Sequence, residues 1–132
     1  MKTQGKSVVI PAISKIAQSP VEGEIWWINL DPTQGHEQNG WRPIVVVSPG
    51  NFNDAAGRLI AVPCTTKAAP PGTHRAQLQV QLAGMPEPTY AMPDQVRVLN
   101  WKERKAQFRG QRATSAELDA IRERLKVLQG IQ

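Results

Sequence analysis

The chain has 132 residues, a formal net charge of +5 and one cysteine, Cys64. This length suits one domain with a substantial core, and a single cysteine excludes an intrachain disulfide and fits a reducing compartment, so we expect a cytoplasmic protein. No apolar run approaches the roughly 18 residues that span a bilayer, which argues against membrane association. The basic charge permits binding to nucleic acid or to an acidic protein without deciding between them.

Residues 1–20 are basic and contain no acidic residue. The apolar run at 8–10 ends at Pro11 and is too short for a signal peptide. We interpret residues 1–20 as a poorly ordered basic arm, with an edge strand over 7–10 as the alternative. The compact domain is placed at residues 21–132.

Two predicted strands, 24–30 and 44–47, hold a long polar loop between them. Alternation along the first strand assigns one face to the core (Trp26, Ile28 and Leu30) and leaves a mixed face (Ile25, Trp27 and Asn29). Trp27 either lines a cleft or subunit contact or fills core. The loop, residues 31–43, is much longer than the two to five residues of a simple hairpin. Because loops on rigid strands often carry function, we expect it to be functional.

Further along the chain, Ser48 is expected to cap a short helix over 51–56, with Pro49 in its first turn. A strand over 59–62 then runs into Pro63-Cys64-Thr65-Thr66-Lys67, which brings two hydroxyls and an amine into a loop. Period-two alternation predicts a strand over 76–82 with three inward side chains, Leu78, Val80 and Leu82. Residues 90–92 and 96–99 form one interrupted strand or two short ones, because Pro93 cannot join a central ladder.

Residues 97–112 carry six cations and one acidic residue, with Trp101 and Phe108 among them. This mixture suits a nucleic-acid surface, and equally an ordinary solvated turn with two rings in the core. A capping box at Thr114 opens a helix with apolar residues at helical spacing, and Gly130 can end it. Short strands with one terminal helix indicate a mainly β, α+β fold: a small β-barrel or strongly bent sheet closed by the helix.

Common catalytic sets are missing from the sequence. There is no phosphate-binding glycine loop and no Gly-x-Ser-x-Gly. With two histidines and one cysteine a metal site is not expected, and we expect no cofactor. A Cys64–His36 pair is disfavoured because Cys64 ends an apolar strand. The polar set that is left could cleave RNA without a metal, by moving protons and stabilising charge on phosphorus: His36, Glu37, Arg42, Thr65, Lys67 and Asp94.

Several fragments, in order and spacing, resemble the MazF/PemK (Kid) family of toxin endoribonucleases. The first set runs through Gly23-Glu24-Ile25-Trp26, Leu30-Asp31-Pro32-Thr33, Gly35-His36-Glu37-Gln38, Arg42-Pro43 and Val46-Val47-Ser48-Pro49. The later fragments are Val62-Pro63-Cys64-Thr65-Thr66 and Asp94-Gln95-Val96-Arg97. The resemblance covers residues 22–130 and leaves out the first twenty.

The resemblance implies an SH3-like, CcdB-type barrel with a C-terminal helix that forms a homodimer. It further implies a type II toxin that cleaves single-stranded RNA, chiefly mRNA, at specific sequences without a metal. The products would be a 2′,3′-cyclic phosphate and a 5′-hydroxyl, and translation and growth would stop. A cognate antitoxin would block the site with an acidic, disordered C-terminal tail.

The family's site residues can be carried over by motif. The resemblance assigns catalysis to Arg42 and Thr65, as in MazF-like members, and adds His36 and Asp94 as in Kid-like members. The Kid-type pattern also needs an arginine where this chain has Met92, so it is incomplete and His36 stands as the third catalytic candidate. RNA contacts are expected from Glu37, Gln38, Thr66, Lys67, Asp94 and Gln95. Two alternatives stay open: a CcdB-like gyrase poison, and a catalytically silent RNA- or antitoxin-binding module.

Overall fold

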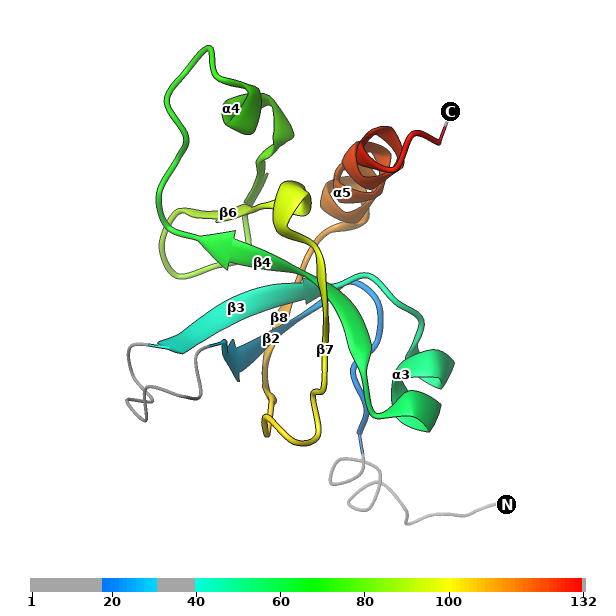
Figure 1. The fold of residues 1–132 in the computed structure, drawn as a ribbon. Coiled ribbons are helices and arrows are strands. Elements are labelled where there is room, and N and C mark those ends of the chain that lie inside the picture. Colours follow the sequence, from blue (N-terminus) through cyan, green and yellow to red (C-terminus); the bar gives the residue numbers. More distant parts are fainter. Residues whose placement is uncertain (1–17, 31–39, 132) are drawn as a thin grey trace, which may run out of the picture.

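Residues 18–30 and 40–131 are described by the computed structural model (Figure 1). The first half of the chain forms β2 (Glu24–Asn29), β3 (Trp41–Val46), α3 (Gly50–Ala56) and β4 (Leu59–Thr65). The second half forms α4 (His74–Leu78), β5 (Val80–Leu82), β6 (Thr89–Ala91), η2 (Pro93–Gln95), β7 (Arg97–Leu99), β8 (Gln107–Arg112) and α5 (Ser115–Leu128). No helix in these two described ranges is long and apolar enough to cross a membrane.

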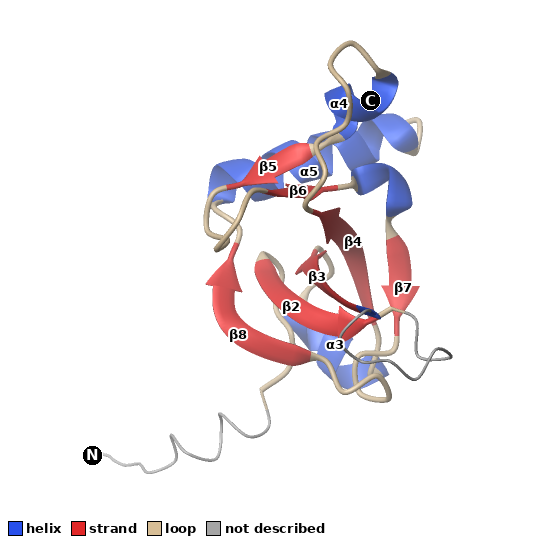
Figure 2. Ribbon diagram, turned by 90° about the vertical axis from the view of Figure 1, so that its left-hand side faces the viewer, coloured by secondary structure: helices blue, strands red, loops and turns tan. Residues whose placement is uncertain are grey.

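The strands form one antiparallel sheet in the order β5-β6-β4-β3-β2-β8, with β7 paired to the first half of β4. The sheet curls strongly, so that Figure 2 shows its strands around three sides of the molecule, with α5 across one end. This curled half-barrel with a C-terminal helix confirms the expected mainly β architecture. The consequence for function is that strand ends distant in sequence converge on the concave side.

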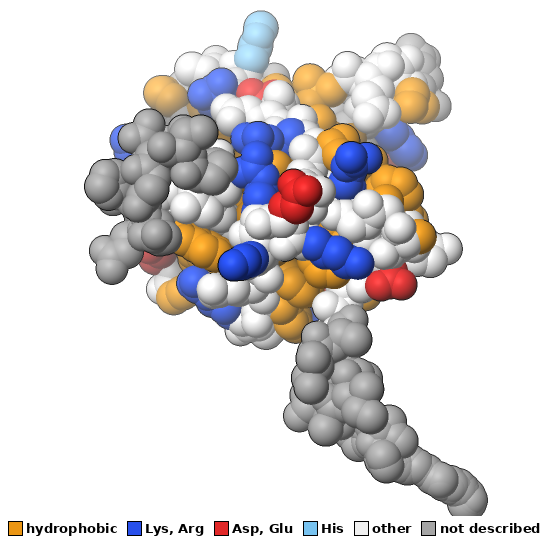
Figure 3. Space-filling view, turned by 60° about the horizontal axis from the view of Figure 1, so that its bottom comes forward, with side chains coloured by type: hydrophobic (Ala, Val, Ile, Leu, Met, Phe, Trp, Pro, Cys, Tyr) orange, Lys and Arg blue, Asp and Glu red, His pale blue; other side chains and the backbone are white. Residues whose placement is uncertain are grey.

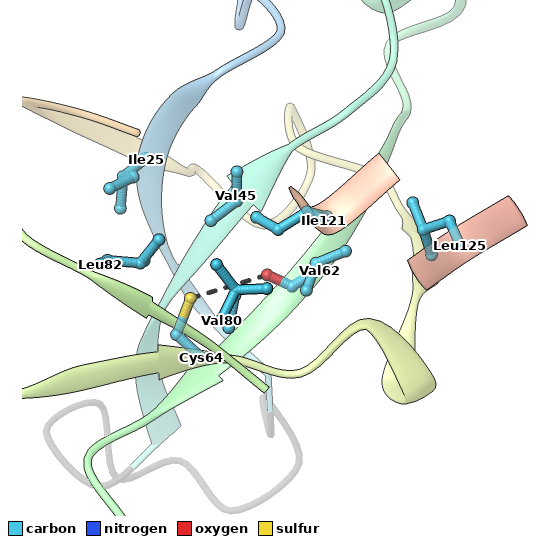
Figure 4. Packing of buried hydrophobic residues seen from close by; sticks show 9 residues of the cluster. Ile25, Val45, Val62, Cys64, Val80, Leu82, Ile121 and Leu125 are labelled. Carbon is cyan, nitrogen blue, oxygen red and sulfur yellow. Dashed lines mark hydrogen bonds between the residues drawn. The ribbon is translucent and has the colours of Figure 1, made fainter. Parts of the chain in front are cut away.

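Both faces of the central strands contribute to the core, because each packs against its own apolar cluster. On one face Ile25, Val45 and Val62 meet Ile121 and Leu125 of α5, as Figure 4 shows. On the other face the sheet packs around Trp26, whose ring stacks on Phe108 with centroids 5.4 Å apart. The face expected to be mixed is mixed: Ile25 is fully buried, whereas Trp27 is half-buried, because the curl covers both sides of the central strands.

The second strand begins earlier than expected. β3 starts at Trp41, opposite Asn29, and includes Arg42 and Pro43. Pro43 had indicated loop because it lacks an N–H, yet it lies opposite Trp27 in the register. Pairing with β2 overrides that local signal. Arg42 is thus a strand residue, whereas His36, Glu37 and Gln38 lie outside the described residues.

The segment expected to be a strand over 76–82 is half helix. α4 occupies His74–Leu78, and the Thr73 side chain accepts a hydrogen bond from the backbone N–H of Ala76 at 3.2 Å. Only Val80–Leu82 is strand, with Val80 and Leu82 buried as expected. The physical reason is local: a threonine N-cap stabilises a helical turn that alternation alone cannot reveal.

Two more differences concern Ser48 and β8. The N-cap of α3 is Pro49, without a side-chain cap. The Ser48 hydroxyl instead donates to Asn53 Oδ1 at 2.5 Å and accepts from the Ile60 N–H at 2.8 Å, which ties α3 to β4.

β8 was not predicted at all, because its sequence QFRGQR has little apolar alternation. It exists through pairing with β2.

Other expectations were confirmed. β6 and β7 are two short strands separated by η2, which begins at Pro93. The Thr114–Glu117 capping box is present at α5. At the other end, Gly130 has φ 75°, and Ile131 N–H donates to Lys126 O at 2.8 Å, as in a Schellman motif. Leu128, however, is exposed rather than packed.

Residues 1–17 of the expected basic arm, including the alternative strand at 7–10, lie outside the described residues. Residues 18–20 are described, and they lie against α3. The Ser19 hydroxyl donates to Asp54 Oδ1 at 2.7 Å, and Asn53 Nδ2 donates to Pro20 O at 2.8 Å.

Candidate active site

An open cleft of about 360 Å³ lies where β2, β3 and the end of β4 face the β5–β6 connection. Figure 2 looks at the molecule from the side on which these strand ends lie. Polar groups from β4 and apolar rings from β2 and β3 share the wall. The residues that line the cleft are Trp27, Trp41, Arg42, Pro43, Cys64, Thr65, Thr66, Lys67, Met85, Pro86, Glu87 and Thr89.

Arg42 is the first cation of the cleft. It lies on β3 opposite Ile28, is exposed, and donates one hydrogen bond from Nη1 to Trp41 O at 3.0 Å. No carboxylate in the described ranges forms an ion pair with it. Arginine has five N–H donors, so most of the guanidinium remains available. Such a fork binds two oxygens of a phosphate at once.

The end of β4 supplies the hydroxyls and the second cation. Thr65 is half-buried, and its Oγ1 accepts from Lys67 N–H at 3.2 Å, which leaves the hydroxyl proton free to donate. Gln79 holds the following turn from both sides: its amide donates to Lys67 O at 3.2 Å and accepts from Ala69 N–H at 2.9 Å. Thr65, Thr66 and Lys67 are therefore presented to the cleft on a fixed backbone.

Cys64 lies at the base of the cleft but faces the core. Its side chain is buried, its Sγ lies 3.8 Å from Val62 O, and the bond is drawn in Figure 4. Burial raises the pKa of the Cys64 thiol far above its usual range. Since the thiolate is the nucleophile, Cys64 is not poised for catalysis. This agrees with the sequence argument that disfavours Cys64 as a nucleophile.

Asp94 and Gln95 are not brought to the cleft. They lie on η2, where Asp94 Oδ2 is 3.5 Å from Arg75 Nη2 of α4. Its Oδ1 atom is buried and has no hydrogen-bond partner in the described structure. Their expected RNA contacts remain predictions, as do those of His36, Glu37 and Gln38, which lie outside the described residues.

Sequence reasoning missed several residues of the cleft. Trp41 and Pro43 were expected in the loop over 31–43, and no role was predicted for Met85 and Glu87. Glu87 is the one carboxylate among the described lining residues, and it can accept a proton or repel an anion. Its only sequence signal is position in a Pro- and Gly-rich turn, which does not distinguish it from other exposed acids.

The connection between β7 and β8 carries further cations, Lys102, Arg104 and Lys105, which do not line the cleft. Lys and Arg side chains gather on the face shown in Figure 3, at the end of the molecule where the β7–β8 connection lies in Figure 1. Trp101 and Phe108 pack against the second apolar cluster, as the solvated-turn interpretation expects for the rings. In residues 18–30 and 40–131 no three His, Cys, Asp or Glu side chains are grouped to hold a metal ion.

The family model for PemK-like, MazF-like toxins of type II toxin–antitoxin systems matches residues 21–128. The chain belongs to this family. It is 37% identical over 111 residues to the endoribonuclease toxin MazF of Escherichia coli strain K12, which covers 84% of this chain and 95% of that protein. The resemblance to the MazF/PemK family is thereby confirmed.

Solved structures agree with this assignment. MazF from Deinococcus radiodurans superposes with a TM-score of 0.71 and 32% identity, over 86% of this chain and 98% of that one. A MazE–MazF structure from the same organism gives a TM-score of 0.69 and 26% identity, with the same coverage. The expected fold is confirmed, and the chain is a MazF/PemK-type endoribonuclease toxin.

Proposed function

We propose that this MazF/PemK-type toxin cleaves single-stranded RNA, chiefly mRNA, at specific sequences and without a metal ion. One observation carries the proposal: Arg42 from β3 and Thr65 and Lys67 from β4 line the same cleft. Two cations and a hydroxyl in one open cleft suit the anionic backbone of a nucleic acid. Cleavage of mRNA in the cytoplasm would stop translation and growth.

The proposed reaction is an internal transfer at phosphorus. The 2′-oxygen attacks the adjacent phosphorus, the bond from phosphorus to the 5′-oxygen breaks, and a 2′,3′-cyclic phosphate and a 5′-hydroxyl remain. One proton leaves the 2′-hydroxyl and one reaches the 5′-oxygen, so the overall step is proton-neutral. His36 or Glu37 would carry these protons.

The described cleft residues would stabilise the charge that builds on the phosphate oxygens. Arg42 would bind two of these oxygens, and Thr65 would donate a hydrogen bond to one of them. Lys67 would supply a point charge. Neighbouring nucleotides would be contacted by the polar side chains of Thr66, Gln38 and Gln95.

Two protein partners follow from the same proposal. A cognate antitoxin with an acidic tail would occupy the cationic cleft in place of RNA, in line with the MazE–MazF complex of the structural relative. A second copy of this chain would form a homodimer. Its contact surface would include Ile60 of β4 and Val98 of the edge strand β7, which are paired with each other and have exposed side chains.

The test is cleavage of one long defined RNA by purified protein, with the ends mapped. We expect cyclic phosphate ends, the same cleavage pattern with and without EDTA, and a loss of at least about 100-fold in kcat/KM for Arg42→Ala, the magnitude typical of losing one group that stabilises developing charge. Arg58→Ala, which removes an exposed arginine outside the cleft, is the matched control and should behave as wild type. Near-wild-type turnover by Arg42→Ala would show that Arg42 does not handle the phosphate. Intact RNA with the wild-type protein would show that the proposed reaction is wrong.

A further inference from the structure

Trp27 differs from Trp26 and Trp101 in what it touches, and it shares the cleft wall with Trp41. Trp26 is 5% exposed within the second apolar cluster, and Trp101 packs on it with ring centroids 6.1 Å apart. Trp27 belongs to neither apolar cluster and lines the cleft. A large half-buried ring on the wall of an open cleft leaves apolar area without a protein partner.

Three residues of β8 fix the Trp27 ring in place. The indole Nε1 donates to Gln111 Oε1 at 2.7 Å. The Arg109 guanidinium lies over the ring, with its central carbon 4.4 Å from the ring centroid. Arg109 is itself oriented by a 3.2 Å hydrogen bond from Nη2 to Gln107 Oε1. The register between β2 and β8 shifts between Ile25 and Trp26, and such a bulge changes the direction of nearby side chains.

We propose that Trp27 and Arg109 form a stacking platform for a nucleobase beside the phosphate that is cleaved. This inference rests on the proposed ribonuclease function and adds a binding position to it. Trp27 lies opposite Pro43 in the register, and Pro43 follows Arg42 directly in β3. Trp27 and Arg42 both line the cleft, so a nucleotide whose phosphate contacts Arg42 has the Trp27 ring beside it, with Arg109 over that ring.

The chemistry of the platform selects a base rather than another ligand. An aromatic ring offers a flat face to any nucleobase, and a guanidinium plane stacks in the same way while adding positive charge near the RNA backbone. An acidic peptide has carboxylates but no comparable flat face, so it gains only from the charge. The hydrogen bond to Gln111 holds the indole in one orientation before RNA arrives, which lowers the entropy cost of stacking.

The experiment uses a short RNA with one cleavage site of the wild-type protein, and a series in which one nucleotide at a time lacks its base. We expect one position flanking the cut where removal of the base lowers the wild-type kcat/KM by about 5- to 150-fold, the range that corresponds to the stacking energy of one base. Trp27→Leu should lose activity on intact RNA by a similar factor, and removal of that same base should have no further effect on it. Trp27→Phe should keep most of the sensitivity.

The design separates folding from stacking. Trp27→Leu should cleave the RNA that lacks the critical base as fast as wild type, which also shows that the variant is folded. Arg109→Ala, at an exposed position, should lower both the activity and the sensitivity in part, while Arg58→Ala should change neither. If wild type cleaves RNA and Trp27→Leu keeps full sensitivity at every position, the platform is wrong and the ribonuclease proposal stands. If wild type leaves intact RNA uncut, the ribonuclease proposal itself fails, and the platform with it.

Discussion

Cys64 and Thr65 are neighbours on β4 with opposite surroundings. Cys64 is buried in the cluster under α5, whereas Thr65 is half-buried at the cleft. Successive side chains of a strand point to opposite faces, so one strand serves the core and the site at once. The position of Thr65 in the cleft therefore depends on the packing of Cys64 in the core. A substitution of Cys64 can change activity by moving Thr65.

The raised pKa of Cys64 leads to a prediction about stability. The folded state keeps the thiol protonated, while the unfolded chain releases its proton above a pKa of about 8.5. Because the unfolded state then binds fewer protons, the free energy of unfolding should fall as pH rises beyond that point, by up to about 1.4 kcal/mol per pH unit. Urea unfolding between pH 7.5 and 10 measures this. Cys64→Ala should lack that part of the slope, and an identical slope in both proteins would contradict the assignment.

At the scale of elements, the first turn of α5 is fixed by one short network. Thr114 Oγ1 accepts from Glu117 N–H at 3.1 Å, and Glu117 Oε1 accepts from Thr114 N–H at 2.9 Å. The other oxygen of Glu117 accepts from Ala83 N–H at 2.8 Å, just beyond β5. The cap therefore joins the helix to the sheet as well as starting it.

We predict that Thr114→Ala lowers the free energy of unfolding by about 1 kcal/mol, the usual cost of losing an N-cap. Glu117→Ala should cost more, because the Thr114 and Ala83 N–H groups both lose a charged acceptor. Urea unfolding monitored by circular dichroism gives both values. Glu123→Ala, on the exposed side of the same helix, is the control and should change stability by less than about 0.5 kcal/mol. Equal effects of all three substitutions would show that the cap is unimportant.

For the whole molecule, the outer edge of the sheet at β7 is an apolar surface that a single copy leaves uncovered. Val98 is 59% exposed, and Ile60 and Val96 beside it are each exposed by more than a third. Within the described ranges β7 pairs only with β4. An apolar edge strand tends to pair or pack with another chain, which fits the proposed homodimer.

Val98→Lys should therefore shift the protein from dimer to monomer, because a charge on this edge opposes burial. Light scattering after size-exclusion chromatography at several concentrations measures the change. Val127→Lys is the matched control, since Val127 is exposed on α5 away from that edge. A Val98→Lys variant that dimerises as well as wild type would place the contact elsewhere.

Some features of this protein were predictable because their signals are local. The capping box and apolar spacing of α5 lie within one segment, and the strand over Glu24–Asn29 carries its own alternation. The motifs around Arg42-Pro43 and Pro63-Cys64-Thr65-Thr66-Lys67 are also continuous in sequence. They were enough to indicate the family and four residues of the cleft: Arg42, Thr65, Thr66 and Lys67.

Other features depend on residues far apart in the chain, which only the tertiary structure brings together. β8 is a strand because it pairs with β2. The cost of burying the Glu24 carboxylate is offset by Arg112, whose Nη1 lies 3.2 Å from Glu24 Oε2. α4 interrupts a segment whose alternation indicated strand. Strand pairing and sheet curvature are non-local, so alternation and turn residues alone do not report them. The sequence by itself determined the family, the terminal helix and the polar groups near Arg42 and Thr65; the curl of the sheet decided that these groups share one cleft with Trp27, and that Asp94 does not line it.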